Sequence, residues 1–374
     1  MRKFVSTLVL VMLLASMAAA CTPQAANVEP APAESGESEA AADMETVEEE
    51  VVAEEPAAET EIEAAEEAAE TVEPVSVVFL LPQTMSPFEI DMWNGIDQAL
   101  ADGIASEIKM IEMKEPTEFE QTIRQVSEAG YDVVISAFFL VKEPILKVAP
   151  DFPDTTYLLV YESVPDPISD YPNVRGIQYD VQEGSYVCGV AAALMSENNH
   201  VGFIGGADFP GIVKFLAGYE AGLTSVNPDI TLDIAWAGTF VDPDKGHELG
   251  LSLFERGDEV VMHAANKTGL GVFIAAEESA GYAVGVDVDQ TALAPSNIIC
   301  SALTNPGASV YSSLLDIATG NFTNGTIDWG IDDGVPAAAL NKLLLSEEAL
   351  TAARAAEEQI VAGEIEVPVS TETR

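Results

Sequence analysis

The sequence has few positive charges: 15 Lys and Arg stand against 63 Asp and Glu, which gives the 374-residue chain a formal net charge of −48. Proteins bind nucleic acids through basic surfaces that contact the phosphates, so this balance excludes a nucleic-acid-binding role. The acidity fits either a salty habitat or a preference for neutral or cationic ligands, and charge alone does not separate the two.

Histidine and cysteine are also scarce, with three residues of each. His200, His247 and His263 are scattered without the spacing of a metal site, so we expect neither a bound metal nor a cofactor. Cys188 and Cys300 lie in the apolar runs "SYVCGVAAAL" and "NIICSAL". We expect both to be small buried hydrophobic residues, and a disulfide between them is an alternative that no pattern supports.

Familiar catalytic motifs are missing as well. The sequence has no G-x-S-x-G elbow, no Cys/His pairing and no GK[ST] phosphate loop. "DVDQT", which runs from Asp287 to Thr291, matches the D-x-D-x-T nucleophile loop of haloacid-dehalogenase-type phosphatases. That loop opens its fold, whereas here most of the folded chain precedes it. We therefore expect a protein that is not an enzyme and keep a Mg²⁺-dependent phosphatase only as an alternative.

The N-terminus has the features of an export signal. Arg2 and Lys3 precede an apolar run and the small residues of "ASMAAAC", so residues 1–20 are predicted to be a signal peptide. Cys21 follows these small residues as in a bacterial lipobox, which predicts its lipidation; ordinary cleavage after Ala20 is the alternative. No later apolar run is long enough to span a bilayer.

An acidic segment follows Cys21. Residues 22–75 contain eighteen acidic residues and no Lys or Arg, and they offer no aromatic side chains to bury. Such a segment stays disordered, so residues 21–75 are predicted to be a lipid-anchored linker. We expect the folded part to be held at the extracytoplasmic face of the cell membrane.

From Val75 onward, apolar strands alternate with helical patterns, as in "VSVVFLL" and "EIDMWNGIDQALADGI". Two such arrays predict an α/β fold with two Rossmann-like lobes around a cleft. We expect an N-terminal lobe over residues 76–180, completed by about 301–328, and a C-terminal lobe over 181–300, completed by about 329–374. Ligands bind beyond the carboxyl ends of parallel strands. The candidate strand ends are "FFL" (138–140), "YES" (161–163), "MHAAN" (262–266) and "DVD" (287–289).

Aromatic residues accompany these strand ends. Phe88 and Trp93 follow the first strand, and Phe138 and Phe139 close another. Such rings belong either to the core or to a cleft in which they sandwich a flat ligand. The stretch "NKTGLGV" (266–272) places small residues at a helix start, which suits an anion, a hydroxyl group or close packing of helix on strand.

Four ordered stretches match a known family: "GFIGGADFPGIVKFLAGYEAGLTSVNPDI", "AGTFVDPDKGHELG", "KTGLGV" and "YAVGVDVDQ". Over about residues 76–370 the chain resembles the basic membrane protein (BMP) family of substrate-binding lipoproteins, of the purine nucleoside receptor type. The resemblance implies a type I periplasmic-binding-protein-like fold and a monomer that closes on a small ligand. It also implies delivery of that ligand to the permease and ATPase subunits of an ABC importer; a ligand sensor for a signalling partner remains the alternative.

The family's ligand contacts carry over at three positions. The resemblance implies that Asp287 accepts the ribose hydroxyl groups, that Phe88 stacks on the base, and that Gly269 brings the backbone close to the ligand. Asp289 lies one step further out on the same side of the strand, so we expect it to cap the following turn or to face solvent.

Three other positions depart from the family. Met262 stands where a second stacking phenylalanine is usual, Tyr161 where an aspartate grips the base edge, and Thr304 where a lysine approaches the sugar. A hydrogen bond to a charged group contributes about 1.5–3 kcal/mol, so these losses count against assigning a purine nucleoside specifically. The predicted ligand is a small polar molecule, either a nucleoside or a nucleoside-like compound. The predicted ligand-binding residues are Phe88, Phe139, Tyr161, Met262, Gly269, Asp287 and Thr304.

Overall fold

The computed structural model describes residues 71–82 and 85–370. The predicted signal peptide, Cys21 and nearly all of the acidic linker lie outside the described residues. Residues Glu67–Arg374 form one compact unit of the chain. Within the two described ranges, no helix combines the length and the apolar character that crossing a membrane requires.

Two six-stranded sheets form the framework of this unit. The first has the strand order β11 (Gly325–Trp329), β5 (Val174–Tyr179), β4 (Thr156–Val160), β3 (Val133–Ala137), β1 (Val75–Leu81) and β2 (Ala105–Glu112). The second has the order β12 (Ala338–Leu340), β10 (Ile298–Leu303), β9 (Tyr282–Asp287), β8 (Val260–Ala264), β6 (His200–Gly205) and β7 (Thr231–Trp236). Every neighbouring pair is parallel except β10 and β12, which are antiparallel.

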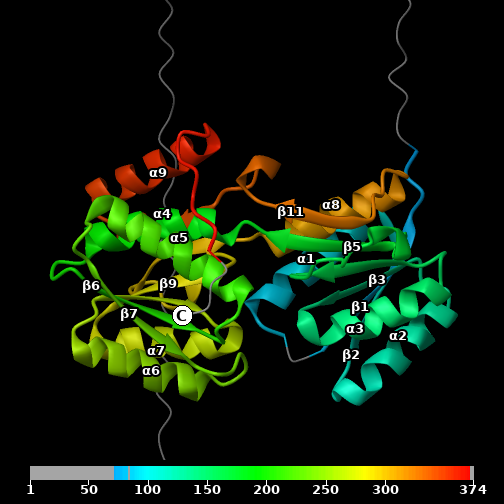
Figure 1. Cartoon of the computed structure of the whole chain (residues 1–374), viewed down its shortest axis with the longest axis horizontal. Coiled ribbons are helices and arrows are strands. Elements are labelled where there is room, and N and C mark those ends of the chain that lie inside the picture. The colour runs from blue at the N-terminus through cyan, green and yellow to red at the C-terminus, as the bar shows by residue number, and fades with distance from the viewer. Residues whose placement is uncertain (1–70, 83–84, 371–374) are drawn as a thin grey trace, which may run out of the picture. The chain divides into compact units, whose positions relative to one another are not determined.

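Helices cover both faces of each sheet, as Figure 1 shows. The first sheet carries α1 (Pro87–Ala101) and α8 (Pro306–Ala318) on one face, and α2 (Phe119–Glu128) and α3 (Phe139–Val148) on the other. The second carries α4 (Val181–Met195), α5 (Pro210–Val226) and α9 (Glu347–Val361) on one face, and α6 (Pro243–Arg256) and α7 (Leu270–Ser279) on the other. Short 3₁₀ turns occupy Pro116–Glu118, Ala149–Asp151, Ile168–Asp170, Asn266–Gly269, Thr291–Leu293 and Ile331–Asp333.

The chain passes between the two sheets three times within the described residues. It leaves the first sheet after β5, returns after β10 to add α8 and β11, and crosses again to add β12 and α9. The predicted limit of the second array at residue 300 falls inside β10, which stays in the second sheet through Leu303. Arg175 anchors the returning segment: it is 2% exposed and bonds to Asp316 at 2.6 Å and to the Thr323 carbonyl at 3.0 Å.

Local sequence explains the strands and helix ends. Strand β1 has a continuous apolar sequence because its central and C-terminal residues are buried between helix layers. Helix α1 begins at a capping box, in which Ser86 accepts a bond from the Phe88 amide and Glu89 accepts one from the Ser86 amide. Helix α6 ends at Gly257, whose φ of 105° stops the helix at no steric cost.

The predicted state of the two later cysteines is confirmed. Cys188 on α4 and Cys300 on β10 are both fully buried and free, and they belong to the same hydrophobic cluster. Burial raises the pKa of the Cys188 thiol well above its ordinary value, and the neighbouring Cys300 thiol acts in the same direction. Both side chains therefore behave as small core residues.

Candidate functional site

A cavity of about 560 Å³ lies beyond the carboxyl ends of strands from both sheets. Its wall includes residues 138–140 after β3, 161–163 after β4, 264–266 around the end of β8, and 286–287 at the end of β9. All four strand ends that the sequence indicated contribute to it. Small-molecule sites in proteins have volumes of about 300–1,000 Å³, so the cavity has the size of such a site.

Aromatic side chains form much of the wall. They are Phe138, Phe139, Tyr161, Tyr179, Phe209, Phe215 and Phe240. On the first-sheet side the rings of Phe138 and Tyr161 are nearly parallel, with centroids 6.0 Å apart. On the second-sheet side the rings of Phe209 and Phe240 have centroids 5.8 Å apart. Rings on both sides of a cavity suit a molecule with a flat portion, because stacking adds about 0.5–1.5 kcal/mol beyond burial.

Backbone strain is concentrated at this cavity. Seven non-glycine residues in the described ranges have a positive φ. Four of them line the cavity: Phe138 (73°), Tyr161 (64°), Asn266 (48°) and Asp287 (70°). Each such residue costs about 1–3 kcal/mol, and bulky aromatic residues avoid this region. The strain is held at the strand ends where the side chains meet, which is a feature of functional sites rather than of plain core.

Asp287 joins the two halves of the wall. It is the last residue of β9 in the second sheet, and its Oδ1 accepts a hydrogen bond of 2.7 Å from Tyr161 Oη, at the end of β4 in the first sheet. Thr304 Oγ1 donates to the same oxygen at 3.3 Å. Among the described residues these are the two donors to this carboxylate, so Oδ2 is left to accept a hydrogen bond from a molecule in the cavity.

The electrostatics of the pair keep Tyr161 as a donor. Burial raises the pKa of Asp287 to about 6, although the bonds from Tyr161 and Thr304 act to lower it. The charges of Glu89 and Asp91 raise it further. Burial, followed by the charge of Asp287, raises the pKa of Tyr161 well above its ordinary value. The phenol therefore stays protonated, and above about pH 6 the carboxylate faces the cavity as a strong acceptor.

Two further predicted residues stand directly behind the wall. Phe88 is 2% exposed, and its ring centroid lies 5.3 Å from that of Phe138 and 5.2 Å from that of Tyr161. Thr304 is 4% exposed and reaches the cavity only through Asp287. Of the predicted set, Phe139, Tyr161 and Asp287 line the cavity itself, whereas Phe88 and Thr304 position the residues that do.

Met262 and Gly269 do not reach the cavity. Met262 is fully buried in β8, two residues before Ala264, which does line the wall. Strand β8 is buried along its whole length, so its sequence does not reveal which residues face the cleft. Gly269 packs against His263: a Cβ added there would lie 2.0 Å from the Nδ1 atom of that histidine. Close packing of a helix start on β8 explains this glycine.

The aspartate pair needed for a phosphatase is not assembled at the cavity. Asp289 is exposed, and its Oδ1 accepts a hydrogen bond of 2.9 Å from the Thr291 amide. It therefore caps the following turn, as predicted, and it is not among the residues that line the cavity. The match of "DVDQT" to a nucleophile loop has no counterpart in the geometry.

Several residues of the cavity wall are not predicted individually from the sequence. They include Gln178, Phe209, Lys214, Phe240 and Asn266. Phe209 and Lys214 stand around the start of α5, after the glycine-rich stretch that follows β6. The position of that stretch at a strand end is a signal from which these residues could have been predicted. Phe240 comes from the loop between β7 and α6, for which no periodic pattern exists.

Comparisons with known proteins agree with this geometry. The family model described as "ABC transporter substrate-binding protein PnrA-like" matches residues 75–371. A Listeria monocytogenes protein named CD4+ T-cell-stimulating antigen is 30% identical over 268 residues, which cover 67% of this chain and 74% of the relative. A Lactococcus lactis protein named ABC transporter nucleoside-binding protein BmpA is 29% identical over 279 residues, with coverage of 67% and 75%.

A solved structure supports the fold. The solute-binding protein of an ABC transporter system from Aeropyrum pernix superimposes with a TM-score of 0.70 at 23% identity, covering 80% of this chain and 94% of that one. The two sheets with helices on both faces are thus a type I periplasmic-binding-protein fold, as predicted.

Proposed function

This chain belongs to the PnrA-like family of ABC transporter substrate-binding proteins, and from that premise we propose that its cavity captures a nucleoside or a nucleoside-like molecule. The bound molecule is handed to the permease of an importer. Lipidation of Cys21 and the acidic linker that follows hold the receptor at the extracytoplasmic face of the membrane.

One observation carries the proposal: a carboxylate, Asp287, stands in an aromatic cavity whose strand-end residues are held in strained backbone conformations. Strain of this kind is retained where it aims side chains at a ligand. The rings of Phe138 and Phe209 would face a flat base from opposite sides, and Asp287 would accept hydroxyl hydrogens. The Lactococcus lactis relative is named a nucleoside-binding protein, which agrees with this assignment.

The charges of the wall favour a neutral ligand. Glu162 is already paired with Lys142 at 2.9 Å, and Lys214 supplies the positive charge among the described wall residues. Tyr161 occupies one oxygen of Asp287, so fewer acceptors remain than in a site with a second aspartate. We therefore expect a polar molecule with at least one hydroxyl donor and a flat apolar part, bound more weakly than by a receptor with the full set of charged contacts.

A ligand panel tests the proposal. The full-length protein is heated in the presence of nucleosides, bases and sugars, one at a time. A ligand present at about a hundred times its dissociation constant stabilises the folded state by about 2.7 kcal/mol. At least one nucleoside should raise the melting temperature, and its bare base and bare sugar should do so less. If no member of the panel shifts the transition, the nucleoside assignment is wrong.

A matched pair of variants locates the site. Asp287→Asn and Asp289→Asn each remove one negative charge, at positions two residues apart. Asp287 lines the cavity, whereas Asp289 is exposed and does not. Asp287→Asn should weaken binding and Asp289→Asn should not. Equal effects would refute the role of Asp287.

The genes beside this gene discriminate between import and signalling. Permease and ATPase genes there would favour import, whereas a sensor kinase gene would favour the signalling alternative.

A further inference from the structure

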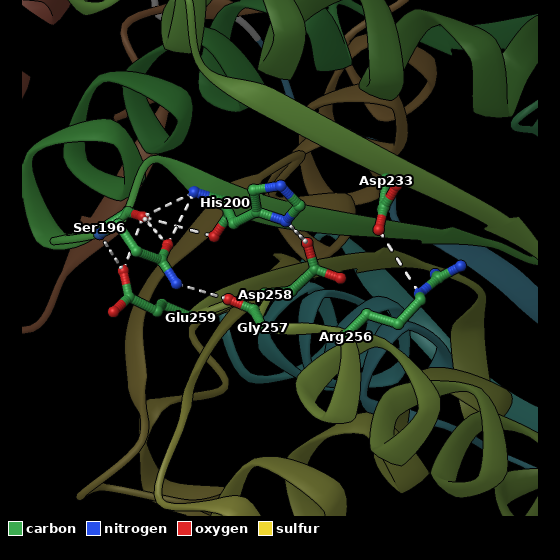
Figure 2. A network of polar contacts seen from close by, with 8 residues as sticks. Ser196, His200, Asp233, Arg256, Gly257, Asp258 and Glu259 are labelled. Atoms are coloured by element: carbon green, nitrogen blue, oxygen red, sulfur yellow. Dashed lines mark hydrogen bonds and ion pairs between the residues drawn. The ribbon is translucent and has the colours of Figure 1, made fainter.

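A second polar cluster lies in the C-terminal lobe, away from the cavity. His200 is the first residue of β6, Asp233 lies within β7, and Asp258 precedes β8 by two residues. Since β6 runs between β7 and β8, these three side chains converge toward the amino ends of the strands, opposite the end that borders the cavity. Figure 2 shows the His200 ring facing the Asp258 carboxylate, with Asp233 further along on the same side of the ring. One nitrogen or oxygen atom from each lies within 4.8 Å of those of the others.

The strand pattern places a glycine beside this cluster. The two-residue period of β6 places His200, Gly202 and Ile204 on one face. Gly202 pairs with Asp233 across to β7. A Cβ added to it would lie 2.8 Å from Leu253 Cδ1 and 3.2 Å from Val261 Cγ2, and in ordinary contact with Asp258 Cγ at 3.5 Å. Packing against Leu253 and Val261 therefore explains the glycine, which lies next to the Asp258 carboxylate.

Asp258 has no ordinary reason to be buried here. Its side chain is fully buried, and neither carboxylate oxygen has a hydrogen-bond partner among the described residues. Nδ1 of His200 is likewise without a hydrogen bond there and lies 3.7 Å from Oδ1 of Asp258. Buried carboxylates are normally paired, hydrogen-bonded or bound to a metal. Within the described chain its one partner is the His200 imidazole at 3.7 Å, which forms an ion pair only when that ring is protonated. A metal ion held between the two would satisfy both groups, whose buried polar atoms make no hydrogen bond there.

Nearby charges do not replace a metal. Nε of Arg256 lies 3.4 Å from Oδ2 of Asp233, and this arginine is half exposed. It partners Asp233 rather than Asp258, and its long side chain can swing away into solvent. Glu259 faces the other way, where it accepts bonds from Ser196 Oγ at 2.8 Å and from the Asn198 amide at 2.9 Å.

The surrounding backbone holds the two ends of the cluster together. Asn198 Nδ2 donates to the Gly257 carbonyl at 2.8 Å, and Asn198 Oδ1 accepts from the His200 amide at 2.8 Å. The loop before β6 is thereby tied to the turn that carries Asp258, as the dashed lines in Figure 2 show. Side chains held by such supporting bonds are preorganised for a ligand.

We propose that His200, Asp233 and Asp258 bind one divalent transition-metal ion, with Zn²⁺ as the first candidate. An imidazole and two carboxylates are common zinc ligands, and a tetrahedral site leaves the fourth position to water. Their two negative charges balance the ion. Ligands at about 2.0–2.2 Å from zinc stand about 3.4 Å apart, so the side chains must draw in by about 1 Å. Ca²⁺ and Mg²⁺ prefer sites built of oxygen ligands alone.

No spaced motif reveals this site, because its ligands come from two strands and a separate turn. The ion would join β6, β7 and the turn before β8 at the end of the sheet away from the cavity. It would therefore stabilise the lobe and leave ligand affinity unchanged.

Zinc titration of the metal-stripped full-length protein tests the proposal. The very acidic chain will bind ions weakly at many places, so the measurement is the tightest single equivalent. Asp258→Asn and His200→Ala should weaken that equivalent by about tenfold or more. The control is His247→Ala, which removes a partly exposed histidine paired with Glu278 and should change nothing. Loss of the same equivalent in the control, or no difference between wild type and the two variants, overturns the site.

Cobalt supplies an independent readout. Co²⁺ bound by a histidine and two carboxylates in a tetrahedral site gives an intense visible absorption that ions on surface carboxylates do not give. The band should appear with one equivalent of Co²⁺ in wild type and in His247→Ala, and should be absent in Asp258→Asn. That variant keeps the shape of the side chain and removes a buried charge, so it should fold. A weak octahedral spectrum in all proteins would refute the proposal.

Discussion

Replacing Asp287 by asparagine should stabilise the folded protein while weakening ligand binding. Burial raises the pKa of this carboxyl group from 3.8 to about 6. A group whose pKa is higher in the folded state binds more protons there than in the unfolded state between those two values. The free energy of unfolding therefore falls as the pH rises from about 4 to about 6, and at neutral pH the ionised carboxylate destabilises the folded state. Asparagine carries no charge and removes this destabilisation.

The magnitude follows from the pKa difference and from what asparagine keeps. A difference of about two pKa units corresponds to at most about 3 kcal/mol, and the opening of the cavity to solvent reduces this to about 1–2 kcal/mol. Asparagine still offers an oxygen to Tyr161, and it tolerates the φ of 70° at this position better than most residues. Loss of a charged acceptor should make the binding free energy less favourable by about 1.5–3 kcal/mol, which raises the dissociation constant roughly tenfold to a hundredfold.

Thermal unfolding at two pH values provides the assay. At about pH 8 the Asp287→Asn variant should melt about 2–4 °C above wild type, and at about pH 4 the two should coincide because Asp287 is then protonated. Tyr161→Phe should act in the opposite direction at about pH 8, since it deprives the ionised carboxylate of its 2.7 Å donor. A variant that melts below wild type at about pH 8, or a gap that does not depend on pH, would refute the reasoning.

The remaining predictions concern the scaffold. Gly95→Ala should destabilise the protein by about 1–3 kcal/mol in urea denaturation, because its Cβ would lie 2.1 Å from a backbone oxygen of α8. Arg175→Met should cost about 1.5–3 kcal/mol by the same measurement, since it removes the bond to Asp316 that anchors the returning segment; an unchanged midpoint would contradict this. Cys188 and Cys300 should resist iodoacetamide in the folded protein and react after unfolding, as mapped by mass spectrometry, because both thiols are buried and free.

The alternation of strands and helices was readable because buried parallel strands have continuous apolar sequences. It located the four strand ends that line the cavity, and the four ordered motifs identified the family, which the family model confirms. One strand end differs from its prediction: the apolar pattern continues the strand through Phe138 and Phe139, but β3 stops at Ala137 and α3 starts at Phe139. The positive φ of Phe138 causes this break. A phenylalanine in the sequence does not predict a positive φ, because bulky residues rarely adopt one.

The residues that the sequence could not place depend on contacts between distant segments. The bond between Tyr161 and Asp287 joins residues 126 positions apart and exists only because the two sheets meet at their carboxyl ends. Met262 is predicted from its alignment with a stacking position of the family, whereas its side chain is fully buried in β8 and is not among the residues that line the cavity. Lipidation of Cys21 and the disordered state of the linker remain predictions.

Two buried carboxylates at opposite ends of the second sheet illustrate how partners decide function. Burial is the main reason that the pKa of Asp258 and that of Asp287 are both raised to about 6. Asp287 accepts bonds from hydroxyl groups of Tyr161 and Thr304, and its surroundings are aromatic, which suits a hydroxylated organic molecule. Asp258 has no such donor in the described chain and instead faces an imidazole, which suits a metal ion. The two sites should therefore act independently: Asp258→Asn should leave ligand affinity intact, and Asp287→Asn should leave zinc binding intact.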